Sequence, residues 1–170
     1  MRSKFTKWSH ILPLVYSLFI GNLSVAQDLA PDFSGVDMRI ERHSEKPITL
    51  SDYRGKVVFI DFWASWCPPC LLSLPAYEAM RAQIGGDDFE IIAINVDENP
   101  EDGLLFLEDN PVSYSVLADP TGEIGIPYRV RSLPAAYLID REGRIVNSYR
   151  NFKAGDEVSL KLEIESLIRQ

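Results

Sequence analysis

The sequence contains few of the side chains that build metal centres and disulfide-rich scaffolds, with two cysteines, two histidines and three methionines among 170 residues. Two cysteines cannot form a disulfide-dense fold, and two histidines supply little for a metal site. Basic residues are also scarce, because 17 Lys and Arg stand against 25 Asp and Glu for a net charge of −8. This deficit disfavours binding to nucleic acid or to an anionic membrane. The phosphate-loop patterns GxGxxG and GxxxxGK[ST] are absent as well, so no nucleotide site is indicated.

Long hydrophobic runs are limited to the N-terminus, where residues 11–23 are almost wholly apolar. Basic residues and no acidic one precede this run, and the small residues Ser24, Val25 and Ala26 follow it. That order is typical of a secretory signal peptide. The run of about 13 residues is short of the ~20 that span a bilayer. We therefore predict a signal peptide over residues 1–26, cleaved after Ala26 or kept as an uncleaved anchor, and a single domain over 27–170.

The rest of the chain has the pattern of one α/β domain. Strands are predicted where β-branched and aromatic residues cluster, and helices where apolar residues recur every three to four positions. We expect an edge hairpin within 30–56, strands at 57–62, 89–96 and 114–118, helices at 68–84 and 100–109, a turn with a short helix at 119–128, a hairpin of 135–140 with 144–149, and a helix from 156 onward. Strands that alternate with helices before a final hairpin predict a three-layer sandwich on a mixed sheet.

Both cysteines lie in Trp66-Cys67-Pro68-Pro69-Cys70, where a buried strand gives way to a helix. At a helix N-terminus this spacing brings the sulfurs within bonding reach, and the free N–H groups and the helix dipole favour a thiolate. A thiolate is the attacking species in disulfide exchange, and a second thiol resolves the mixed disulfide. We predict Cys67 as the nucleophile and Cys70 as the resolving thiol. Because proline has no N–H, we expect the Cys70 amide to be the donor that reaches the Cys67 sulfur.

A cysteine pair at this spacing could also serve as a structural disulfide or as a metal ligand. A structural disulfide across so short a loop would contribute only about 2 kcal/mol. Zinc requires four ligands, which two cysteines and one histidine at unmatched spacing do not supply, so no metal site is predicted. A two-thiolate Cu(I) site remains an alternative because soft ligands suit that ion.

The segment from Asp61 to Cys70 has the sequence DFWASWCPPC and resembles the active site of the thioredoxin superfamily. The wider pattern is similar to its exported TlpA/ResA-type branch of thiol–disulfide oxidoreductases, and the likeness extends over about residues 30–168. It is supported by weaker matches at 30–33, 50–56, 94–97, 128–134 and 137–140. The resemblance implies a thioredoxin-like α/β/α sandwich on a mixed central sheet with an N-terminal hairpin extension. It also implies that the redox-active cysteine pair serves in place of a bound cofactor.

The resemblance assigns roles to three further residues. Pro134 matches the cis-proline that faces the cysteines, and the backbone of Leu133 before it could pair with an extended substrate segment by strand addition. Asp61 stands where thioredoxins keep a buried acid. Burial would raise its pKa and allow it to shuttle a proton for Cys70. The alternatives for Asp61 are an exposed strand end or a structural pair.

One position departs from the family pattern. Several relatives carry a glutamate three residues after the second cysteine, where it assists proton movement, whereas this chain has Ser73. Asp61 would then carry the proton chemistry alone. Of the two flanking tryptophans, we expect Trp63 to pack in the core. Trp66 is expected to lie beside the disulfide and, with Pro68 and Pro69, to position the substrate.

Two other polar features of the sequence are an acidic cluster and a single histidine in the predicted domain. The acidic cluster does not alternate as calcium ligands do, so we expect a solvated loop and helix start for Asp97, Glu98, Glu101 and Asp102. His43 lies in a polar hairpin and is expected to be exposed.

The sequence therefore predicts an exported thiol–disulfide oxidoreductase that acts on protein thiols and disulfides, periplasmic where the cell has an outer membrane. The resemblance suggests a reductase that receives electrons from a membrane thiol-transfer protein. We expect a monomer. A thioredoxin-fold Cu(I) carrier and a thiol peroxidase are the alternatives. The peroxidase would keep its first chemical step without Cys70, whereas disulfide reduction would stall.

Overall fold

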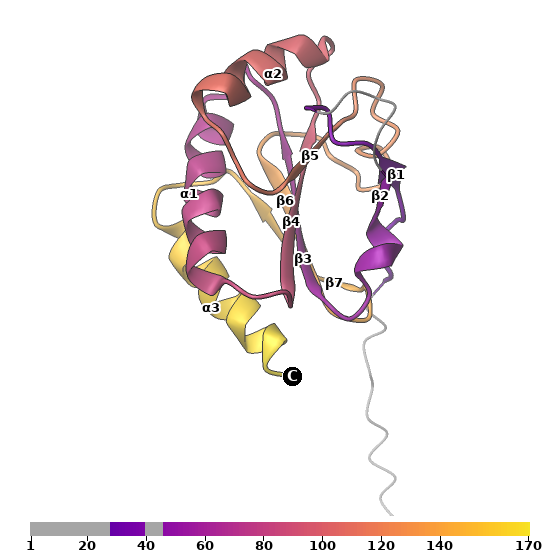
Figure 1. Ribbon diagram of the computed structural model, residues 1–170, viewed down its shortest axis with the longest axis vertical. Coiled ribbons are helices and arrows are strands. Elements are labelled where there is room, and N and C mark those ends of the chain that lie inside the picture. The colour runs from indigo at the N-terminus through magenta and orange to yellow at the C-terminus, as the bar shows by residue number, and fades with distance from the viewer. Residues whose placement is uncertain (1–27, 40–45) are drawn as a thin grey trace, which may run out of the picture.

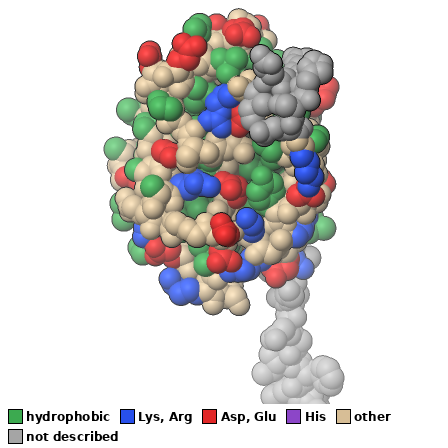
Figure 2. Space-filling model, viewed as in Figure 1, with side chains coloured by type: hydrophobic (Ala, Val, Ile, Leu, Met, Phe, Trp, Pro, Cys, Tyr) green, Lys and Arg blue, Asp and Glu red, His purple; other side chains and the backbone are tan. Residues whose placement is uncertain are grey.

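The computed structural model describes residues 28–39 and 46–170. The predicted signal peptide and His43 lie outside the described residues. Within the described part of the chain, no helix is both long and apolar enough to cross a membrane. Acidic and basic side chains are interspersed with apolar ones on the face shown in Figure 2.

A mixed five-stranded sheet forms the centre of the domain (Figure 1). Its order is β5-β4-β3-β6-β7, with bounds Ser115–Ala118, Phe89–Asn95, Val57–Trp63, Ala135–Ile139 and Ile145–Arg150. The first three of these strands are parallel, whereas β6 and β7 run antiparallel to their neighbours. All seven residues of β3 are buried, as expected for a parallel strand covered on both faces. The predicted mixed sheet is confirmed.

The three described α-helices cover one face of the sheet, with α1 and α3 on the left and α2 at the top in Figure 1. They are α1 (Pro68–Ile84), α2 (Pro100–Asp109) and α3 (Asp156–Ile168). Side chains of a strand alternate between its faces, and Phe59 and Trp63 of β3 join Leu74 of α1 in one apolar cluster. The predicted bounds of α1 and α2 are confirmed. These bounds have local causes. Both helices begin with proline, and α1 ends before Gly85, which has a φ of 62°.

The opposite face is covered by shorter structure. Strands β1 (Ser34–Gly35) and β2 (Ile48–Thr49) pair as a separate hairpin and lead into the 3-10 helix Leu50–Tyr53. The predicted hairpin is confirmed, but it covers the sheet face rather than extending its edge. Residues 119–130 complete this layer as a series of turns, so the short helix predicted there is wrong. The Asp119 carboxylate accepts the N–H groups of Ile124 and Gly125 at 3.1 and 2.8 Å, which shapes the turns.

The chain before β1 and just after it contacts both outer strands of the sheet. Near its start, Ile145 of β7 donates to the Asp28 carbonyl oxygen at 3.2 Å. Beyond β1, Met38 donates to the Val116 carbonyl of β5 at 2.8 Å. In between, Ala30 and Phe33 pack into the apolar cluster behind the sheet. Residues 28–39 therefore run behind the sheet from one edge to the other.

Candidate active site

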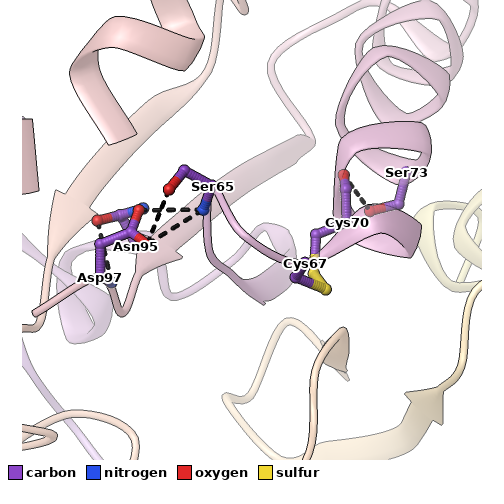
Figure 3. Close-up of a disulfide and its surroundings, with 6 residues drawn as sticks. All are labelled: Ser65, Cys67, Cys70, Ser73, Asn95 and Asp97. Carbon is purple, nitrogen blue, oxygen red and sulfur yellow. Dashed lines mark hydrogen bonds between the residues drawn. A yellow bond between two sulfur atoms is a disulfide. The ribbon is translucent and has the colours of Figure 1, made fainter. Parts of the chain in front are cut away.

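The cysteines lie at the carboxyl end of β3, where the chain turns into α1. Cys67 is the residue before the helix, in an extended conformation, and Pro68 and Pro69 occupy its first positions. The two sulfurs are joined in a disulfide (Figure 3). Cys67 is 4% exposed and Cys70 is fully buried, so Cys67 is the more accessible of the two cysteines. The Cys70 N–H donates to the Cys67 carbonyl oxygen at 2.9 Å, a different acceptor from the sulfur that we expected.

An apolar groove of about 410 Å³ is lined on one side by Trp66, the residue before Cys67. Trp66 and Leu133 both line it, although they are far apart in the sequence. Trp66 is 67% exposed and Ile126, another lining residue, is 72% exposed. The peptide bond between Leu133 and Pro134 is cis, as the resemblance implied. The structure thus brings the residue before Cys67 and the residue before Pro134 to one surface.

Asp61 lies in the middle of β3 with no exposed surface. By strand alternation it faces the same side as Phe59 and Trp63, which share a cluster with Cys70 of α1. Neither carboxylate oxygen has a hydrogen-bond partner among the residues that the structure describes. Burial without a partner raises the pKa of Asp61 well above its ordinary value. The alternatives of an exposed or a structurally paired Asp61 do not hold.

Ser73 and Trp63 are both buried in this region. The Ser73 hydroxyl donates to the Cys70 carbonyl oxygen at 3.1 Å (Figure 3). Trp63 packs against Phe106 of α2 with ring centroids 5.7 Å apart, which confirms its expected packing role.

A second cavity, of about 350 Å³, is lined by Tyr77 and Pro134 among others.

Asp97 is not the solvated residue that the sequence suggested, because it is 1% exposed. Its carboxylate accepts the Ser65 N–H at 3.0 Å and the Ser65 hydroxyl at 3.0 Å. It also accepts the Asn95 side-chain amide at 2.7 Å (Figure 3). Glu98, Glu101 and Asp102 are not buried. The available signal for Asp97 was its place directly after a buried strand, at the edge where the cysteines also lie.

In the part of the chain that the structure describes, metal-binding side chains do not gather near the cysteines. Across residues 28–39 and 46–170, no group of three or more His, Cys, Asp or Glu side chains is placed to hold an ion. The reactive group that the described residues form is the cysteine pair itself.

A disulfide at the first turn of the helix that follows the central strand of a mixed sheet defines a thioredoxin-fold thiol–disulfide oxidoreductase. The sequence pattern of the AhpC/TSA family matches residues 26–148. The chain belongs to this family, and within it to the relatives of the thiol–disulfide oxidoreductase ResA.

Three comparisons illustrate the relationship. The chain is 31% identical to ResA of Bacillus thuringiensis subsp. konkukian over 134 residues, covering 79% of this chain and 72% of that protein. It is 32% identical to ResA of Bacillus subtilis over 131 residues, covering 76% and 70%. Among solved structures, a candidate thiol:disulfide interchange protein DsbE from Chlorobium tepidum superposes with a TM-score of 0.76 at 34% identity. That match covers 84% of this chain and 96% of the other.

Proposed function

We propose that this protein is an exported reductase of protein disulfides. The observation that carries the proposal is the Cys67–Cys70 disulfide at the start of α1, beside the exposed ring of Trp66. A redox pair next to an exposed apolar surface suits a partner protein, because buried aromatic anchors dominate the affinity of protein interfaces. The reducing direction follows from the resemblance to the TlpA/ResA-type branch.

The reaction proceeds in two exchanges. In the reduced protein, the Cys67 thiolate attacks one sulfur of the partner disulfide, forming a mixed disulfide and releasing the other partner sulfur as a thiolate. Cys70 then loses its proton and attacks the Cys67 sulfur. This step forms the Cys67–Cys70 bond and frees the second partner sulfur, which takes up a proton. Two electrons pass to the substrate, and an external dithiol must reduce the protein again.

Asp61 serves the second exchange in this proposal. Cys70 is fully buried, so its proton needs an acceptor inside the domain. Asp61 is a buried acid on the α1 side of β3, and burial raises its pKa toward the range in which a carboxylate accepts a proton from a thiol and returns it. Ser73, bonded to the Cys70 carbonyl, supports the helix turn and takes no part in the proton transfer.

Substrate positioning falls to the two walls of the apolar groove. The Leu133 backbone before Pro134 pairs with an extended segment of the partner and aligns its disulfide with Cys67. Trp66 supplies apolar contact area on the other wall. Pro68 and Pro69 fix the first helical turn, since their φ angles suit a helix start.

The cellular setting rests on the N-terminal sequence and on kinship. Residues 1–26 are proposed to direct export, so that the domain acts outside the cytoplasm as a monomer, or tethered to the membrane if the segment is retained. Electrons are proposed to come from a membrane thiol-transfer protein. The intact mass of the protein recovered from the extracytoplasmic fraction of the cell shows whether the chain is cleaved after Ala26.

The experiment that tests the direction is the reduction potential of residues 27–170, measured by equilibration in graded thiol–disulfide buffers with Trp fluorescence as the probe. A value near about −270 mV is expected for a reductase that needs a dedicated donor. A value near about −120 mV would instead make the protein a disulfide donor. The dithiol–disulfide redox couple should be absent from the Cys67→Ser and Cys70→Ser variants. If the protein shows no dithiol–disulfide redox couple and instead binds one Cu(I) ion tightly, its function is that of a copper carrier and the proposal is wrong.

A further inference from the structure

A buried carboxylate holds the turn that carries Cys67. Residues 64–67 form a tight turn, closed by the Cys67 N–H donating to the Ala64 carbonyl oxygen at 3.2 Å. Ser65 is the second residue of this turn, and both its N–H and its hydroxyl donate to the Asp97 carboxylate. Charge-assisted hydrogen bonds of this kind are stronger than neutral ones. Asp97 therefore anchors the turn through Ser65, two residues before Cys67 (Figure 3).

The Asp97 carboxylate is itself held in place by Asn95 of the sheet, which in turn packs against α2. The Asn95 amide donates to Asp97 at 2.7 Å, and the Asp97 N–H donates back to the Asn95 side-chain oxygen at 3.3 Å. Gly103 of α2 lies against Asn95, where an added Cβ would stand 2.6 Å from the amide nitrogen. A real Cβ does not tolerate such a distance, so any side chain at position 103 would displace Asn95. A chain of contacts thus runs from α2 through Asn95 and Asp97 to the turn.

Cys67 is fixed from both sides by this arrangement. On its C-terminal side, its carbonyl oxygen accepts the N–H groups of Cys70 and Leu71 at 2.9 and 3.2 Å. On its N-terminal side, Asp97 holds Ser65. Restricting Cys67 before the reaction lowers the conformational entropy that forming the internal disulfide must remove.

We infer that Asp97 is a positioning residue for the thiol–disulfide exchange, acting through Ser65 to keep the Cys67 sulfur where Cys70 can attack it. In that step Cys70 forms the bond to Cys67, and the partner sulfur leaves and takes up a proton. Asp97 touches neither sulfur. Its effect is to favour closure of the disulfide over the open dithiol.

The test measures the equilibrium constant for disulfide formation in the folded protein against a reference dithiol. Asp97→Asn replaces one acceptor oxygen by an amide donor, which cannot accept from Ser65 or Asn95. We expect the constant to fall by about threefold to tenfold, with a matching increase in the lifetime of the mixed disulfide. Gly103→Ala keeps every charge and both cysteines, and we expect a smaller fall in the same direction. An alanine normally stabilises a helix relative to glycine, so this direction is specific to the contact with Asn95.

The control is Asp37→Asn, which weakens another buried, hydrogen-bonded carboxylate. Asp37 bonds to Arg39 and Val116, away from the turn, and its variant should lose stability to urea while keeping the wild-type redox constant. The inference is overturned if Asp97→Asn and Gly103→Ala keep that constant within about twofold of wild type, a change below the expected threefold. It is also overturned if Asp37→Asn shifts the constant equally. Should Asp97→Asn fail to fold, Ser65→Ala, which removes the hydroxyl bond to Asp97, is measured with Gly103→Ala, and the inference is overturned if neither variant lowers the constant.

Discussion

Asp61 pairs with Ala136 across the antiparallel ladder that joins β3 to β6. Residues directly opposite each other in such a ladder are side-chain neighbours, so the buried carboxylate faces a methyl group that offers no hydrogen bond. Its neighbours along the same face, Phe59 and Trp63, are aromatic core residues. The acid is therefore kept in an apolar setting on three sides, which is the physical cause of its raised pKa.

Asp61→Asn is expected to stabilise the oxidised protein at pH 8. The folded-state pKa of Asp61 is raised above its ordinary value of 3.8, so between these two values the unfolded chain loses a proton that the folded chain keeps. Stability is thus fully present below the ordinary pKa and is lost as pH rises through the folded pKa. The variant removes this loss, and we expect a gain of about 1–3 kcal/mol at pH 8. Urea unfolding at pH 4 should show a much smaller gain; an equal gain at both values would contradict the assignment.

The same substitution is expected to slow the second exchange. Without a carboxylate to accept the Cys70 proton, resolution of a mixed disulfide at pH 7 should slow by about tenfold to a hundredfold. Stopped-flow measurement of the released partner thiol gives the rate. The rate should recover in strongly alkaline buffer, where Cys70 ionises unaided. A pH profile identical to that of wild type would exclude Asp61 as the proton acceptor.

Cys70→Ser is expected to trap the first exchange. Cys67 can still attack a partner disulfide, but no thiol remains to resolve the product. Mass spectrometry of the unreduced mixture should show one partner chain attached through Cys67. Cys67→Ser is the matched control and should capture none. If Cys70 turned out to be the attached residue, the roles of the two cysteines would be reversed.

Trp66→Ala is expected to weaken recognition of protein substrates selectively. The ring is 67% exposed and lines the apolar groove, and truncation of an aromatic anchor costs about 2 kcal/mol of binding. KM for a protein disulfide should therefore rise by roughly tenfold to thirtyfold. The rate with a small disulfide such as oxidised glutathione should change little. Leu162→Ala, which removes a comparably exposed apolar residue from α3, serves as the control and should leave both substrates unaffected.

Asp37→Ala is expected to destabilise the domain in neutral buffer. Burial raises the pKa of Asp37, but hydrogen bonds from Arg39 and Val116 outweigh it and leave that pKa below 3.8. The stabilisation is present above the unfolded value and is lost as pH falls through the folded one. Loss of this buried, charge-assisted set should cost about 2–3 kcal/mol at pH 7. Thermal unfolding at pH 7 and pH 2.5 checks this, and a deficit that persists undiminished in acid would argue against it.

Local signals in the sequence were sufficient for most of the fold. Proline at the start of α1 and α2, and Gly85 after α1, mark boundaries that depend on nearby residues alone. The cysteine pair is local in the same sense. The burial of Asp97 is not, because it depends on the pairing of Trp63 with Asn95 between β3 and β4, which brings Ser65 within reach. The turns at 119–130 likewise depend on a side chain, since Asp119 accepts N–H groups that a helix would have paired with backbone.

The path of residues 28–39 behind the sheet has a consequence for how the protein behaves among copies of itself. An open strand edge exposes unpaired backbone groups that can recruit another chain. Here the first residues of the domain bond to Ile145 of β7, and Met38 bonds to Val116 of β5, so both outer strands have part of their free side occupied. A chain that lacked all residues up to 39 would keep both cysteines and Asp61, yet it would expose the sheet edges at β5 and β7. Residues 28–39 thus shield both edges of the sheet from pairing with another copy of the chain.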